Sequence, residues 1–241
     1  MSSVPIAAEL LAAVEASPRA TALHDKSAWV GLFTDDGCVE DPFGSRPHIG
    51  HTEIGRFYDT FIGPRLITFH RDLDIVAGTT VIRDLTLEVV MGSGVRMMIP
   101  VFLRYDLSAT ENTWRIARLR AYWELPAMMG QFLRNGVRSL PASLRLSAGL
   151  ARNQRLVGTA GFLSGFRGAG KQGKRLVEGA LAHGLLADEL RECDWGKMIA
   201  AGNTVAASVT ASSGRGVLFA KVERGAIRDV RYFAESPTDP A

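Results

Sequence analysis

The stretch "FTDDGCVEDPFGSRPHIG", residues 33–50, places four carboxylates within seven residues, and the last of them is Asp41. The first two precede a glycine, and this combination is typical of a turn. Asp41 instead ends an alternating, strand-like run and directly precedes Pro42. In an extended chain it shares a face with Val39. One interpretation is a turn aspartate that accepts hydrogen bonds from its own backbone, and the other is a carboxylate directed into a site.

Helical patterns flank this stretch on both sides. Residues 5–33 read as two helices, with Pro18 closing the first, and the run Asp35-Asp36-Gly37 reads as a turn. Thr52–Phe61 has apolar residues on one helical face and ends at Gly63-Pro64. The order predicted for this part of the chain is therefore helix, helix, extended segment, helix.

Four strand-like runs follow, separated by short turns, and they are Leu66–Val76, Thr79–Met91, Val95–Leu107 and Thr113–Leu125. Helices followed by a meander favour an α+β fold rather than a parallel sheet. We expect a curled antiparallel sheet with helices on its concave side, which makes a cone with an internal pocket.

The rest of the chain divides into two parts. Residues 126–173 form a basic connector, because nine Lys or Arg residues and no acid lie between Glu124 and Glu178. For residues 174–241 the sequence predicts a helix and a second meander. We interpret this unit as a degenerate, truncated copy of the first. Its expected strands are Trp195–Ala201, Thr204–Ala211, Val217–Val222 and Ala226–Phe233. The domains expected are thus 1–125, 126–173 and 174–241.

Composition narrows the function classes. The 241 residues contain no apolar run of the roughly 18 needed to span a bilayer, and no signal peptide is recognisable. Cys38 and Cys193 lack metal-ligand spacing and read as free thiols, so we expect a cytoplasmic protein without metal or cofactor. The run "GFRGAGKQ", residues 165–172, has the glycine and lysine spacing of a phosphate-binding loop but lacks the Ser or Thr after the lysine, which argues against nucleotide binding.

The longer stretch "LFTDDGCVEDPFGSRPHIGHTEIGRFYDTF", residues 32–61, resembles the ketosteroid isomerase-like and SnoaL-like branch of the nuclear transport factor 2-like superfamily. The runs "RMMIPV" and "RLRAYWE" are similar to that family's last two strands. The resemblance implies that Asp41 is the catalytic base, which moves a proton between two carbons of a steroid. It also implies an oxyanion hole made by a tyrosine and a protonated aspartic acid, a pairing for which this enzyme family is a known example.

Both oxyanion donors are missing where the resemblance places them. Residues 1–57 contain no tyrosine, and Phe102 falls at the position of the acid. Tyr58 matches a supporting tyrosine of the family, and we take it as the second catalytic candidate, with a core aromatic as the alternative interpretation. The other expected pocket residues are Val39, Phe43, Phe57, His70, Phe102, Arg104 and Trp123.

The leading functional prediction is a ketosteroid isomerase-like protein that binds a hydrophobic polycyclic ligand, with Asp41 transferring a proton. The alternatives are a non-catalytic sterol- or lipid-binding module near membranes and a polyketide cyclase-like enzyme. Residues 127–157 are expected to contact an anionic membrane surface as amphipathic helices, with a packed, solvated helix pair as the alternative. Nucleic acid is not expected as a partner, because the connector lacks interleaved aromatic residues, and a homodimer is left open.

Overall fold

The computed structural model describes residues 3–91, 95–111, 113–134, 168–186, 188–212 and 214–235. Most of the basic connector lies outside these ranges. Residues up to 134 form a described helix. The rest of the amphipathic helices predicted for residues 127–157, and their membrane contact, stay predictions. Within the described residues, no helix combines the length and the apolar character that a membrane crossing requires.

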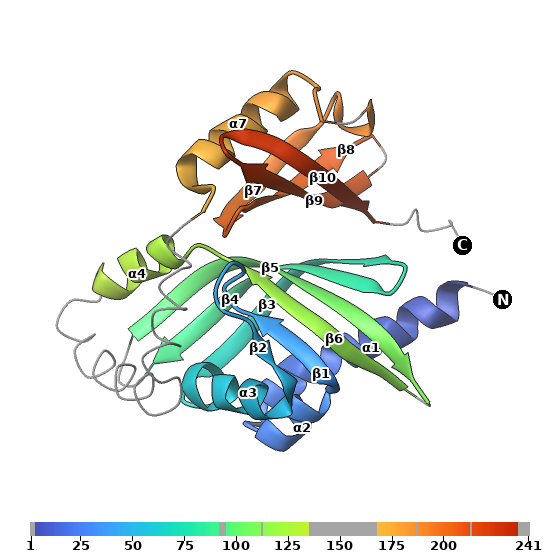
Figure 1. The fold of residues 1–241 in the computed structure, drawn as a ribbon, viewed down its shortest axis with the longest axis vertical. Helices are drawn as coiled ribbons and strands as arrows, with labels where there is room; N and C mark the ends of the chain where they lie inside the picture. The colour runs from blue at the N-terminus through green and yellow to red at the C-terminus, as the bar shows by residue number, and fades with distance from the viewer. Residues whose placement is uncertain are drawn as a thin grey trace.

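The first unit combines helices with a six-stranded curled sheet (Figure 1). Its helices are α1 (Ser3–Ala22), α2 (Lys26–Gly31), α3 (Gly50–Phe57), a π-helical turn (Tyr58–Ile62) and α4 (Leu125–Arg134). Its strands are β1 (Phe33–Glu40), β2 (His48–Ile49), β3 (Leu66–Ala77), β4 (Thr80–Met91), β5 (Val95–Thr110) and β6 (Thr113–Tyr122).

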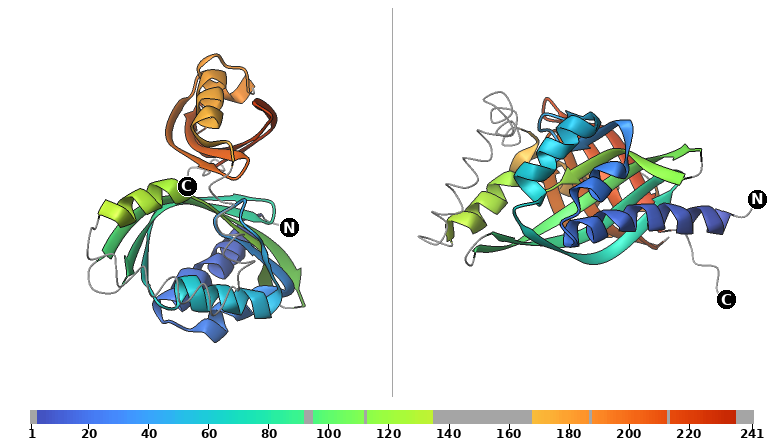
Figure 2. Two further views of the ribbon diagram at one scale, coloured as in Figure 1. Left: turned by 60° about the vertical axis from the view of Figure 1, so that its left-hand side comes forward. Right: turned by 90° about the horizontal axis from the view of Figure 1, so that it is seen from below.

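The strand order is β2-β1-β6-β5-β4-β3. The antiparallel meander expected from β3 to β6 is confirmed. The sheet is mixed rather than wholly antiparallel, because β1 pairs with β6 in parallel. Figure 2 shows the sheet arching over α1, α2 and α3, so the predicted α+β cone is confirmed.

Two local predictions need correction. Pro18 lies inside α1 rather than at its end, because the helix continues to Ala22 and its last turn buries Ala20 and Thr21. Asp35 to Gly37 belong to β1 and form an irregularity in its pairing with β6, not a turn between elements. Tertiary packing overrides the local turn and helix-breaking signals at both places.

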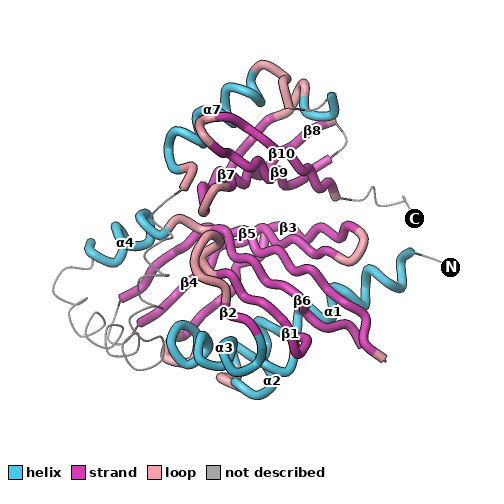
Figure 3. Tube along the Cα trace, viewed as in Figure 1, coloured by secondary structure: helices cyan, strands magenta, loops and turns pink. Residues whose placement is uncertain are grey.

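The second unit is a four-stranded antiparallel sheet preceded by a helix, as expected (Figure 3). Its elements are α7 (Gly170–Ala182), a 3₁₀ turn (Asp188–Leu190), β7 (Asp194–Ala201), β8 (Thr204–Ala211), β9 (Gly214–Glu223) and β10 (Ala226–Ala234). The strand order is β10-β9-β8-β7, and a core of small apolar residues lies under α7. Whether this unit is a degenerate copy of the first stays a prediction.

The two sheets pack face to face, with the second unit on the convex side of the first (Figures 1 and 2). Phe102 and Tyr122 of the first sheet meet Phe219 of the second, with ring centroids 6.5 Å and 4.8 Å apart respectively. At one corner Gly44 and Gly202 approach so closely that a Cβ on Gly44 would lie 2.5 Å from the Gly202 Cα. Since both residues also have positive φ, this contact requires glycine.

Candidate active site

An apolar cavity lies inside the cone. Its volume is about 120 Å³, and it is partly open to solvent at a mouth. The side chains around it come from the end of α3, the π-helical turn, the inner faces of β3 to β5, α4 and the residues next to the ends of β1, β3 and β6. They are Asp41, Phe57, Phe61, Ile62, Arg65, Ile67, Leu87, Val89, Met91, Met97, Ile99, Trp123, Met128, Met129 and Phe132.

The strand pairing around Asp41 directs its carboxylate into this cavity. Asp41 follows β1, whose last residues pair with β6, and the Phe43 N–H donates to the Ala121 carbonyl at 2.7 Å. Trp123, just beyond β6, lines the cavity too, and its indole Nε1–H donates to the Asp41 Oδ1 at 2.6 Å. The local fold thus fixes both the position and the orientation of this carboxylate.

Burial raises the pKa of Asp41 from 3.8 to about 6, because apolar surroundings disfavour the charged carboxylate. The hydrogen bond from Trp123 acts in the opposite direction and is the smaller effect. At pH 7 the group is therefore mostly ionised, yet it is a stronger base than an ordinary aspartate. These are the properties that a general base near neutral pH needs.

This pKa shift predicts how stability depends on pH. Because folded Asp41 holds its proton more tightly than unfolded Asp41, its stabilising contribution is complete below about pH 4 and is lost as pH rises through about 6. Asp41→Asn removes this loss. Between pH 4 and pH 8 the free energy of unfolding of the variant should therefore rise by up to about 3 kcal/mol relative to that of wild type. Urea unfolding at pH 4, 6 and 8 measures the difference. A difference independent of pH would contradict the buried carboxylate.

Three of the expected site residues line the cavity: Asp41, Phe57 and Trp123. Val39 is fully buried in the core between the helices and the sheet and is not part of the lining. Tyr58 is also a core residue, with its ring centroid 5.6 Å from that of Trp29. Its hydroxyl is buried and has no hydrogen-bond partner among the described residues. The structure therefore supports the core interpretation of Tyr58 rather than a catalytic role.

The expected positions of Phe43, Phe102 and His70 need correction. Phe102 faces the second unit, because inner-face residues of β5 are the odd-numbered ones, from Val95 to Tyr105. Phe43 packs against the same cluster between the sheets, with its ring centroid 4.7 Å from that of Tyr122. His70 lies at the surface, where its Nε2 is 2.9 Å from a carboxylate oxygen of Glu88.

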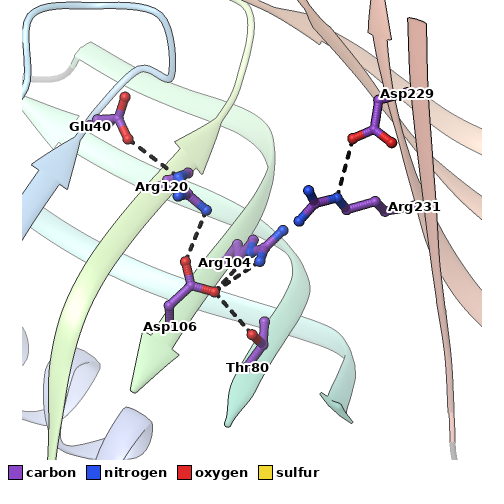
Figure 4. Close-up of polar contacts among 7 residues, drawn as sticks. All are labelled: Glu40, Thr80, Arg104, Asp106, Arg120, Asp229 and Arg231. Carbon is purple, nitrogen blue, oxygen red and sulfur yellow. Dashed lines mark hydrogen bonds and ion pairs between the residues drawn. The ribbon is translucent and has the colours of Figure 1, made fainter. Parts of the chain in front are cut away.

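Arg104 also lies on the outer face, in the ionic network of Figure 4. Its Nε donates to the Asp106 carboxylate at 3.0 Å, and Arg120 bridges the same carboxylate to Glu40. The Arg104 guanidinium also lies 5.3 Å from the ring centroid of Phe233 in the second unit. These contacts assign Arg104 to the interface between the two sheets rather than to the cavity.

Sequence reasoning missed two features of the cavity. Arg65, in the loop before β3, belongs to no motif. Met128, Met129 and Phe132 of α4 close the wall beyond the expected boundary at residue 125, within the segment interpreted as connector. The helical spacing of apolar residues in α4 is the sequence signal that could have identified this part of the wall. Its methionines give this wall an adaptable apolar surface.

The fold of the first unit agrees with a comparison against protein-family models. Residues 9–128 match the nuclear transport factor 2 (NTF2) domain, and this half of the chain belongs to that family. None of the curated proteins compared with the chain matches it.

Several solved structures are similar to the same half. The Δ5-3-ketosteroid isomerase from Mycobacterium sp. is 27% identical, with 50% of this chain and 96% of that chain covered and a TM-score of 0.46. A Mycobacterium tuberculosis protein in complex with estradiol-17β-hemisuccinate is 24% identical, with 49% and 95% covered and a TM-score of 0.45. An epoxide hydrolase of the LEH-like type from M. tuberculosis is 20% identical, with 56% and 97% covered and a TM-score of 0.46.

Proposed function

We propose that the NTF2 half of the chain binds a small hydrophobic ligand of steroid or lipid type, and that Asp41 transfers a proton on it as a general base. One observation carries this proposal. Among the described residues that line the cavity, Asp41 is the sole carboxylate, and it is held by Trp123 against apolar walls. A ligand of that kind would fill the cavity with its apolar body and bring a reacting carbon to the carboxylate.

The chemistry proposed is an isomerisation. Ionised Asp41 takes a proton from the carbon next to a carbonyl, so that the electron pair moves into an enolate. The proton then returns from Asp41 to another carbon of the conjugated system. The burial that raises the pKa of Asp41 to about 6 makes this transfer easier than it is for a solvated aspartate.

A second candidate is a binding protein without catalysis, and the inner face of β5 favours it. That face carries only apolar residues and the buried Tyr105, so no second acid faces the cavity from this strand. The indole of Trp123 already donates to Asp41. With the two donors of the resemblance absent, an enolate oxygen would be poorly stabilised, and each such donor contributes about 10²–10³ in rate.

Ligand binding is tested by filling the cavity. We expect 5-androstene-3,17-dione to bind wild-type protein with one molecule per chain in calorimetric titration. Ile99→Trp places bulk on the cavity wall and should abolish this binding. Met98→Trp is the matched control, because Met98 is the adjacent residue, does not line the cavity and is exposed. Equal binding by both variants would show that the steroid binds elsewhere.

A further inference from the structure

The cavity has a second charged side chain besides Asp41. Arg65 follows the Gly63-Pro64 turn, immediately before β3, and its half-buried side chain is part of the cavity wall. No carboxylate in the described part of the chain lies within salt-bridge distance of its guanidinium, and Asp41 is no exception. The cavity wall therefore carries one anionic side chain, Asp41, and one cationic side chain, Arg65, and the two do not form an ion pair.

Two contacts hold the guanidinium in place. One Nη1–H donates to the Thr60 carbonyl oxygen at 2.6 Å, and the central carbon lies 5.8 Å from the ring centroid of Phe61. A guanidinium has five N–H donors, and Thr60 is the single hydrogen-bond acceptor that the described residues offer it. Within the part of the chain that the structure describes, no further acceptor takes its remaining donors, which leaves them for a molecule in the cavity.

The charge of Arg65 persists although its surroundings are apolar. Burial lowers its pKa to about 10, which leaves the group protonated at pH 7. A cation in an apolar wall is costly without a counter-ion, and a planar carboxylate matches the fork of a guanidinium with two parallel hydrogen bonds. Asp41 repels the same anion once it is ionised, so the anionic end of a ligand is directed to Arg65 and its neutral part to Asp41.

We propose that the cavity selects ligands with an apolar body and one carboxylate, and that Arg65 binds the carboxylate. This inference rests on the proposed function, since it takes the cavity as the ligand site. It adds the chemical class of the ligand: an amphipathic acid rather than a neutral sterol.

The experiment compares two probes with one steroid body, lithocholic acid and its primary amide lithocholamide. Calorimetric titration at pH 7.5 gives both affinities for wild-type protein, Arg65→Gln and Arg65→Lys. We expect wild type to bind the acid about tenfold or more tightly than the amide, as charge-assisted hydrogen bonds typically do. Arg65→Gln should lose this preference while its affinity for the amide changes by less than about twofold. Arg65→Lys should keep part of the preference.

Arg56→Gln is the matched control, because Arg56 is exposed on α3 and lies outside the cavity lining. It removes the same charge and should leave the preference for the acid intact. If wild type binds acid and amide equally, or if Arg65→Gln retains the preference, Arg65 does not bind the carboxylate, whereas the cavity remains a ligand site. If wild type binds neither probe but binds 5-androstene-3,17-dione, the inference is wrong and the ligand site stands; if it binds none of the three, both are wrong.

Discussion

Asp41→Asn is expected to reduce proton exchange on a bound ketosteroid by roughly 10²–10⁴-fold, the usual contribution of a general base. The change is nearly isosteric, and the asparagine carbonyl can still accept the hydrogen bond that Trp123 donates to Oδ1. Mass spectrometry of 5-androstene-3,17-dione incubated in D₂O measures deuterium uptake next to the ketone. Uptake by wild type should rise with pH through about 6, as Asp41 ionises.

Glu40→Gln provides the control for this experiment. Glu40 is the neighbouring residue, but its carboxylate points to the other face of the strand and pairs with Arg120. The variant should exchange deuterium at the wild-type rate. Full isomerisation by wild type should stay well below about 10 s⁻¹, an ordinary enzyme turnover, because the oxyanion donors are absent. Unchanged exchange in Asp41→Asn would remove Asp41 as the base.

Lys197→Met is expected to cost about 3–5 kcal/mol in the free energy of unfolding, the typical result of breaking a buried ion pair. Lys197 reaches from β7 across to the first sheet, pairs with the buried Asp84 and donates to the Leu85 and Val101 carbonyls at 2.9 and 3.0 Å. Its ammonium also lies 4.4 Å from the ring centroid of Phe102. Without it, a carboxylate remains buried between two sheets with its cation lost.

Urea unfolding of the full chain measures this cost. The double change Lys197→Met with Asp84→Leu should recover most of the lost stability, because no unpaired charge is then left in the interface. Lys221→Met removes an exposed lysine that pairs with Glu223 and should cost less than about 1 kcal/mol. A cost for Lys197→Met as small as that of Lys221→Met would mean that the ion pair contributes little to holding the two sheets together.

The fold of the first unit could be predicted because its strands alternate and two of the three breaks between the strands of its meander contain glycine. The same alternation fails on β5 at Val101, Phe102 and Leu103, which are consecutive and all buried. This run is apolar on both faces because the second unit covers the convex side of the sheet. From sequence alone the inner face could not be chosen there, and Phe102 and Arg104 were assigned to the wrong side for that reason.

The residues of the cavity also divide into those that the sequence could predict and those that it could not. Asp41 and Trp123 were recoverable because they belong to motifs whose spacing sets their position. Arg65 was not, because a single arginine after a turn looks the same whether its side chain faces solvent or a cavity. Tyr58 belongs to the same motif as Asp41, but the direction of its side chain depends on how the π-helical turn packs against Trp29. A motif thus identifies a residue more readily than it identifies the direction of its side chain.

Whether Asp41 is a base in an apolar cavity is decided by the pKa of its carboxyl group. Carbon NMR of protein labelled at the aspartate carboxyl carbons, with Asp41→Asn to assign the signal, follows its titration. We expect a pKa of about 6 in the free protein, and a higher value when 5-androstene-3,17-dione fills the cavity and displaces water from the carboxylate. A pKa near the ordinary 3.8 that the steroid leaves unchanged would place Asp41 in solvent and contradict its role as a base in an apolar cavity.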